Sequence, residues 1–178
     1  MPADERRAMI VDATLPLLLE RGEMVTSRQI AEAAGIAEGT IFRVFADKDE
    51  LIAAVIERAL DPAPIEQALA AIDVEAPLEL VVTAAVRLLQ RRALDIARLM
   101  ATVGPRLYPS GPVADRPALV ALFDAHRCHL AVEPTVAARW LAAVTIATSH
   151  PMISAQLAPP ERIAGLFLHG VSNEVRPC

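Results

Sequence analysis

The stretch TSRQIAEAAGIAEGTIFRVFADKDEL, residues 26–51, carries the signals of two short helices joined by a tight turn. Thr26 and Gln29 have the spacing of a capping box, in which each side chain satisfies a free backbone N–H at a helix start. Gly35 is suited to end that helix, because glycine adopts the left-handed backbone of a helix C-terminus without strain. A second short helix is then expected from about residue 38 to residue 45.

Two short helices joined in this way form a helix-turn-helix, which here spans residues 26–45. The small residues Ala33, Ala34 and Gly35 would let the two helices approach each other closely. In such a unit the first helix crosses the DNA backbone, and the second lies in the major groove with its N-terminal residues at the base edges. The sequence therefore predicts a unit that binds double-stranded DNA.

Several residues of this unit carry groups that suit DNA. Gly39 would let the backbone come near DNA, and Thr40 offers a hydroxyl group and a methyl group that can touch a thymine methyl. Arg28 and Arg43 can reach guanine or phosphate. Lys48 begins the next helix, where a cation and free backbone N–H groups together suit a phosphate. The residues expected to bind DNA are Thr26, Arg28, Glu38, Gly39, Thr40, Phe42, Arg43 and Lys48.

The charge of the chain limits where DNA could bind. The net charge is −5, whereas a nucleic-acid binder usually has a basic footprint. Residues 1–60 hold seven Arg or Lys against eleven Asp or Glu, which gives 7 − 11 = −4. Glu38 has two open interpretations: its carboxylate accepts a hydrogen bond from a cytosine amine, or it repels phosphate and lowers the affinity. Any DNA-binding face must be a local patch, for which the candidates are Arg6, Arg7, Arg28, Arg43 and Lys48.

Helical signals continue on both sides of this unit. Hydrophobic residues make up 54% of the chain and aromatic residues 3%, and abundant alanine favours helices. Apolar positions recur at helical spacing over residues 5–22, and Asp47 can cap a helix at 48–60. Asp61-Pro62-Ala63-Pro64 is a break, because proline disfavours helix at the residue before it. Further helical patterns follow at 78–103, 118–131, 135–149 and 160–172.

We therefore expect an all-α protein with an N-terminal three-helix, helix-turn-helix DNA-binding domain and a helical C-terminal ligand-binding and dimerisation domain. The expected limits are 1–46 for the DNA-binding domain, 47–60 for a connecting helix and 61–178 for the effector-binding and dimerisation domain.

The residues at 28–36, 39–42, 45, 48, 50 and 51 resemble the DNA-binding domain of the tetracycline-repressor (TetR) family, and the resemblance runs from about residue 10 to residue 60. It implies a homodimer, a helical effector domain and a repressor that a small-molecule ligand releases from a palindromic operator. Phe42 lies where the family usually has tyrosine, and Ala37 lies where a serine commonly caps the second helix. These two departures and the acidic N-terminal charge are the support for a second hypothesis, a helical ligand-binding or scaffolding protein with weak or lost DNA affinity.

The last two predicted helices are apolar on more than one face, which a lone small domain could not cover fully. We expect them to pair with their copies in a second chain, so that a homodimer forms through about residues 135–172. The middle helices supply apolar and polar side chains of the kind that line a ligand pocket. The candidates for effector binding are Leu89, Arg92, Met100, Val103, Tyr108, Phe123, His126 and Trp140.

Other classes of function find less support in the sequence. His126 and His129 could share a helix face, but a zinc site needs three or four ligands and no further partner lies nearby. The sequence contains no glycine-rich phosphate loop, serine elbow or paired His-Glu metal motif. We therefore expect no metal, no cofactor and no enzymatic activity. The polar, charged start and the lack of a long apolar run predict a cytoplasmic protein with no membrane partner.

Overall fold

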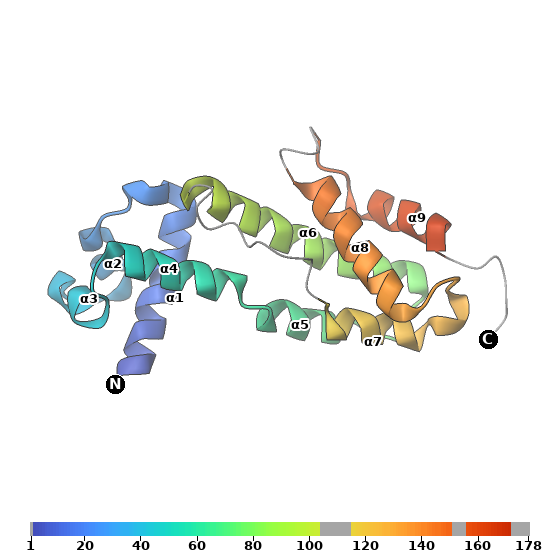
Figure 1. Cartoon of the computed structure of the whole chain (residues 1–178), viewed down its shortest axis with the longest axis horizontal. Helices are drawn as coiled ribbons and strands as arrows, with labels where there is room; N and C mark the ends of the chain where they lie inside the picture. The colour runs from blue at the N-terminus through green and yellow to red at the C-terminus, as the bar shows by residue number, and fades with distance from the viewer. Residues whose placement is uncertain (1, 104–114, 151–155, 172–178) are drawn as a thin grey trace. The chain divides into compact units, whose positions relative to one another are not determined.

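The computed structural model describes residues 2–103, 115–150 and 156–171. Their regular elements are helices, so the predicted all-α fold class is confirmed. The chain divides into two compact units, which are described separately. The first unit contains α1 to α4 and the end of α6 from Arg98, and the second contains α5, the rest of α6, α7, α8 and α9 (Figure 1).

In the first unit α1 contacts α2, α3 and α4, and α2 contacts α3. The division between the units falls after Asp61, so α4 belongs to the same unit as the helix-turn-helix. The core of this unit lies between these helices and includes two residues from the end of α6, Leu99 and Met100, which are both buried. Its helices are α1 (Ala3–Arg21), the 3-10 turn η1 (Gly22–Met24), α2 (Ser27–Ala34), α3 (Glu38–Val44) and α4 (Lys48–Leu60).

The second unit contains a short helix that the sequence did not predict. Its helices are α5 (Ala63–Ala70), α6 (Leu78–Val103, to Ala97 in this unit), α7 (Pro117–Ala125), the 3-10 turn η3 (Arg127–His129), α8 (Pro134–Ser149) and α9 (Pro160–Val171). The sequence predicts a break at Pro62 and Pro64. Proline is tolerated in the first turn of a helix, however, because the N–H groups there make no hydrogen bond within the helix. The expected helix at 118–131 was too long, because α7 ends at Ala125 and a 3-10 turn follows.

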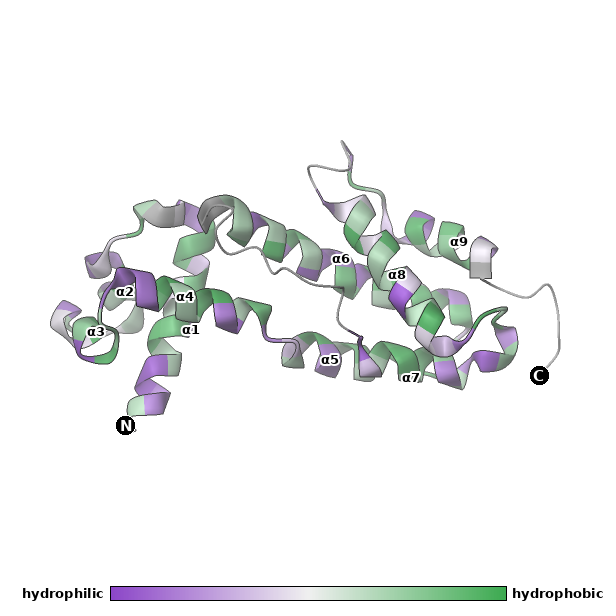
Figure 2. Cartoon of the chain, viewed as in Figure 1, coloured by the Kyte–Doolittle hydropathy of each residue, from purple (hydrophilic) through white to green (hydrophobic). Residues whose placement is uncertain are grey.

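Apolar side chains from every helix of the second unit meet in one core. The rings of Phe123 on α7 and Phe167 on α9 lie 5.7 Å apart, centroid to centroid, within it. Figure 2 shows apolar and hydrophilic residues alternating along α6, as expected for a helix that buries one face. Among the helices of the described residues, none is long and apolar enough to cross a membrane.

Candidate nucleic-acid interface

The two helices of the helix-turn-helix are held by buried apolar side chains and a glycine turn. Ile30 of α2, Ile41 of α3 and Phe45 after α3 are each 1% exposed. Gly35 has φ 65° and ψ 33°, the left-handed conformation that glycine adopts most easily. Its N–H donates to the Glu32 carbonyl, and the N–H of Ile36 donates to the Ala31 carbonyl at 2.9 Å, which together close the end of α2.

The start of α2 has the capping box that the sequence predicts. The backbone N–H of Gln29 donates to Thr26 Oγ1 at 3.3 Å, and the backbone N–H of Thr26 donates to Gln29 Oε1 at 3.0 Å. Ala37, at the corresponding position before α3, makes no such side-chain bond. The first helix of the pair is therefore fixed at both ends, and α3 depends more on its buried face.

A cluster of polar contacts fixes the junction between α3 and α4, and we call it the α3–α4 clasp: Arg7, Phe45, Ala46 and Glu50. Glu50 Oε2 accepts from the Ala46 backbone N–H at 2.7 Å, and its Oε1 accepts from Arg7 Nη1 at 3.0 Å. The Arg7 guanidinium also lies 4.4 Å from the centre of the Phe45 ring, a cation–π contact. The clasp therefore joins α1 to the end of α3 and the start of α4.

The clasp also affects the titration of Glu50. The hydrogen bond from the Ala46 backbone N–H, followed by the bond from Arg7, lowers the pKa of the Glu50 carboxyl below its ordinary value. Because both contacts favour the charged form, they stabilise the folded protein at neutral pH. This stabilisation is lost as the pH falls through the lowered pKa and the carboxylate takes up a proton.

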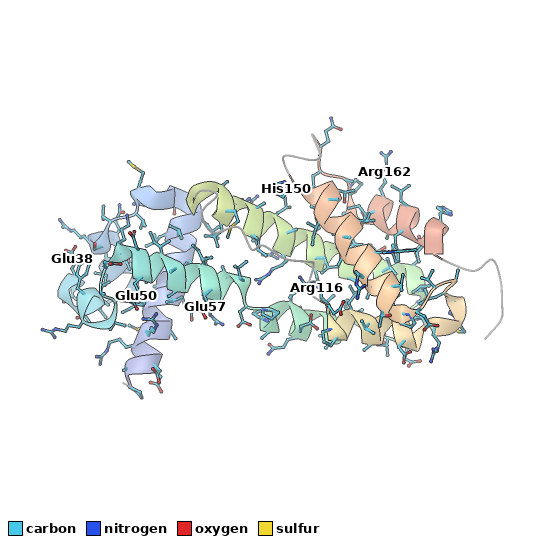
Figure 3. All side chains as sticks on the ribbon, viewed as in Figure 1. Glu38, Glu50, Glu57, Arg116, His150 and Arg162 are labelled. Carbon is cyan, nitrogen blue, oxygen red and sulfur yellow. The ribbon has the colours of Figure 1, made fainter. Side chains whose placement is uncertain are left out.

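Glu50→Gln is expected to weaken the fall in stability between pH 7 and pH 3, because the neutral amide cannot lose a charge. Urea unfolding at several pH values would measure the free energy of unfolding of each variant. At pH 7 the Glu50→Gln variant should be less stable than wild type, and near pH 3 the two should converge. Glu57→Gln, on the same helix (Figure 3), is the matched control, since Glu57 has no ion pair in the described structure. Parallel curves for wild type and Glu50→Gln would contradict the role given to the clasp.

Most of the residues expected to bind DNA lie on the surface of this unit. Thr26, Arg28, Glu38, Gly39, Phe42 and Arg43 are exposed, whereas Thr40 and Lys48 are half-buried. Glu38 lies in the first turn of α3 (Figure 3). Lys48 begins α4 directly after Asp47, whose Oδ1 accepts from the Glu50 backbone N–H at 2.8 Å, so the predicted cap of this helix is confirmed. The contacts of these residues with DNA stay predictions.

Ion pairs engage part of the charged side chains of this unit. Arg58 pairs with Asp12 at 3.0 Å, Glu50 pairs with Arg7, and Glu20 pairs with Arg21 at 3.6 Å. Within the described residues, the exposed guanidinium groups of Arg28 and Arg43 take part in no ion pair. Each pair removes one cation together with one acid, so the unit keeps its net acidic charge, while Arg28 and Arg43 remain accessible to an anionic partner.

The sequence did not reveal the role of Arg7. The sequence predicts Arg7, like Arg6, as part of a basic patch, but the Arg7 guanidinium contacts Glu50 and Phe45. The pairing joins residues 43 positions apart, so no local pattern could have predicted it. The spacing of Asp47 and Glu50 was a partial signal, since an acid three residues after a helix cap commonly accepts a backbone N–H.

The candidates for effector binding fall in different surroundings. Leu89 and Phe123 are part of the core of the second unit, Met100 is buried in the first, and Trp140 is 48% exposed. Arg92 and His126 are half-buried. The Tyr108 position and the side chain of Val103 lie outside the described residues. Their part in ligand binding stays a prediction.

His126 and His129 lie with their ring centres 6.1 Å apart at the end of α7 and in η3. In the part of the chain that the structure describes, no group of three or more His, Cys, Asp or Glu side chains is placed to hold a metal ion.

Known proteins resemble this chain in two ways: in the sequence of the helix-turn-helix region and in the fold. The family described as "Bacterial regulatory proteins, tetR family" matches residues 10–55. The HTH-type transcriptional repressor KstR of Rhodococcus jostii is 41% identical over 58 residues, which cover 32% of this chain and 27% of KstR. The match therefore spans about a quarter of that curated relative.

Solved structures show a likeness over nearly the whole chain. A TetR-family transcriptional regulator from Mesorhizobium loti has a TM-score of 0.62 and 18% identity, and the alignment covers 97% of this chain and 100% of that one. A TetR transcriptional regulator from Streptomyces coelicolor has a TM-score of 0.56 and 24% identity, with 95% and 99% covered. At these identities the likeness concerns the fold. Residues 10–55 thus match the family of tetR bacterial regulatory proteins, and the chain shares its helical fold with solved regulators of that family.

Proposed function

We propose that the protein is a DNA-binding transcriptional repressor that a small-molecule ligand releases from a palindromic operator. The observation that carries the proposal is the exposed face of α3, with Glu38, Phe42 and Arg43, on a helix whose other face is buried. Arg28 on α2 adds a second exposed cation without an ion pair among the described residues. A helix of this kind can enter the major groove while its neighbour contacts the backbone.

The proposal includes a homodimer that forms through α8 and α9. These two helices contact each other in the second unit and still leave large apolar side chains exposed: Trp140 at 48%, Val144 at 38% and Leu166 at 65%. Trp140 and Val144 are four residues apart, so they share one face of α8. A second copy of the same face would cover these side chains by two-fold symmetry.

A dimer explains how two short helices achieve specificity. Two-fold symmetry sets the reading helices about 34–36 Å apart, so that they meet successive major grooves on one side of a palindrome. A ligand that binds better to another arrangement of the dimer shifts the population away from DNA, by no more than its difference in affinity for the two states. The protein would act in the cytoplasm as a binding protein, and we assign it no enzymatic activity.

Selection of random duplex DNA on the purified protein at moderate salt, followed by sequencing, tests the proposal. We expect an enriched palindrome whose enrichment is lost in Arg43→Ala and in Thr40→Ala. Arg127→Ala is the matched control, because Arg127 is an exposed arginine of the second unit that pairs with Asp124. The affinity should fall steeply as the salt concentration rises, since phosphate contacts release counterions.

No enrichment at low salt would contradict the proposal. That result would favour a helical ligand-binding or scaffolding protein that has lost DNA affinity, an alternative that the comparisons do not favour. Thermal stabilisation by small molecules would then be the next measurement.

A further inference from the structure

Phe42 is a large apolar side chain that is not buried in the core. It is 48% exposed, whereas Ile41 and Phe45, its neighbours on α3 and just after it, are each 1% exposed. No aromatic or cation–π contact of the described residues includes its ring. A large aromatic ring that stays in water on a helix of seven residues does little for stability.

The register of α3 places Phe42 on the same strip of helix as Glu38, four residues earlier. Both side chains are exposed. Neither can donate a hydrogen bond to a phosphate, since phenylalanine has no hydroxyl group and the Glu38 carboxylate carries the same charge as phosphate. Arg43 follows Phe42 by one residue and therefore lies about 100° further round the helix. Because Glu38 and Phe42 cannot donate to a phosphate, they are better suited to contact base edges, whereas the neighbouring Arg43 is suited to contact the DNA backbone.

The chemistry of the major groove leaves few partners for such a strip. Its one apolar group is the C5-methyl of thymine, and the cytosine N4 amine is a donor that a carboxylate can accept. The thymine methyl group and the cytosine amine both lie on the major-groove edge of their pyrimidine base. Thr40, whose methyl group could also touch a thymine, is half-buried and offers a smaller apolar surface than the Phe42 ring.

We infer that Phe42 is a specificity-determining residue that contacts the C5-methyl of a thymine in each half of the operator. Glu38 lies beside it, where a neighbouring cytosine amine can donate to its carboxylate. This inference rests on the proposed function. It further specifies the base, thymine, and the group, its C5-methyl, that Phe42 contacts.

Uracil scanning of the selected operator tests the inference. Uracil pairs as thymine does but lacks the C5-methyl, so each thymine is replaced in turn and the dissociation constant is measured. Wild type should bind about fourfold more weakly when the contacted thymine is replaced in one half-site, the value expected for one buried methyl group. At that position Phe42→Ala should bind the thymine and uracil operators equally well, and Phe42→Leu should retain part of the preference.

Lys48→Ala is the comparison for a residue expected to contact phosphate. It should weaken binding to every operator by the same factor and reduce the salt dependence, while the preference for thymine over uracil stays as in wild type. Because Phe42 is exposed, its variants should fold as wild type does, which circular dichroism and the melting temperature would verify.

Two results would overturn the inference while the proposed function stands. One is an operator that wild type binds with no loss at any uracil substitution. The other is a thymine preference that Phe42→Ala leaves unchanged at every position. A failure to enrich any operator would instead refute the proposed function, and the thymine contact with it.

Discussion

Leu166→Asp is expected to convert the dimer into a monomer and to abolish sequence-specific DNA binding. Leu166 on α9 is 65% exposed, and α8 presents Trp140 and Val144 on the face proposed to meet a second copy. In a two-fold interface each substitution removes two buried leucines, worth roughly 1.5–3 kcal/mol each. The new carboxylates add a desolvation penalty, so the dissociation constant of the dimer should rise by about 100-fold or more.

Sedimentation equilibrium at micromolar concentration would measure the dimer, and operator binding would be measured on the same samples. Leu80→Asp is the matched control, because Leu80 is 61% exposed but lies on α6 outside the proposed face. It should remain dimeric and bind the operator. A wild-type protein that is monomeric, or a Leu166→Asp variant that stays dimeric, would refute the interface.

Phe45→Ala is expected to lower the free energy of unfolding by about 3–5 kcal/mol, the usual cost of removing a buried phenylalanine side chain. Phe45 is 1% exposed and follows the last residue of α3. The substitution also removes the ring on which the Arg7 guanidinium lies, a contact worth about 0.5–1 kcal/mol at an exposed site. Urea unfolding should show a lower midpoint with little change in slope.

Phe42→Ala is the matched control, since it removes the same side chain from the same segment. Phe42 is exposed, so its loss should change the free energy of unfolding by no more than about 0.5 kcal/mol. The two phenylalanines should thus separate stability from DNA reading: Phe45→Ala acts on the fold, and Phe42→Ala acts on operator binding. Equal losses of stability in the two variants would contradict the burial that the structure assigns to them.

The elements that the sequence predicted correctly have local signals. The capping box at Thr26, the left-handed turn at Gly35 and the cap at Asp47 each involve residues no more than five positions apart, so their spacing in the sequence determines their geometry. The start of α5 shows the limit of such signals. The same prolines suit both a break and the first turn of a helix, and the contacts of Ile65 and Leu69 with the core decide between them.

The exposure of the candidate DNA-binding residues could be predicted from the sequence, but the contacts that position their helices could not. Exposure of Arg28 and Arg43 followed from helical periodicity, because their helices bury the opposite faces. The α3–α4 clasp could not be predicted, since Arg7 meets Glu50 only when α1 and α4 pack together. The effector candidates were predicted from side-chain type, which does not determine burial: Leu89 is part of a core and Trp140 is exposed.

The clasp bears on how DNA specificity could be transferred between regulators by exchanging segments. A graft of residues 26–45 would carry the helix-turn-helix but leave behind both Arg7 and Glu50, the ion pair that fixes the end of α3. The recipient would then hold the grafted α3 helix, while the residues that contact its C-terminal end would still be those of the recipient. The smallest exchangeable segment that keeps the helix and its support together runs from Arg7 to Glu50.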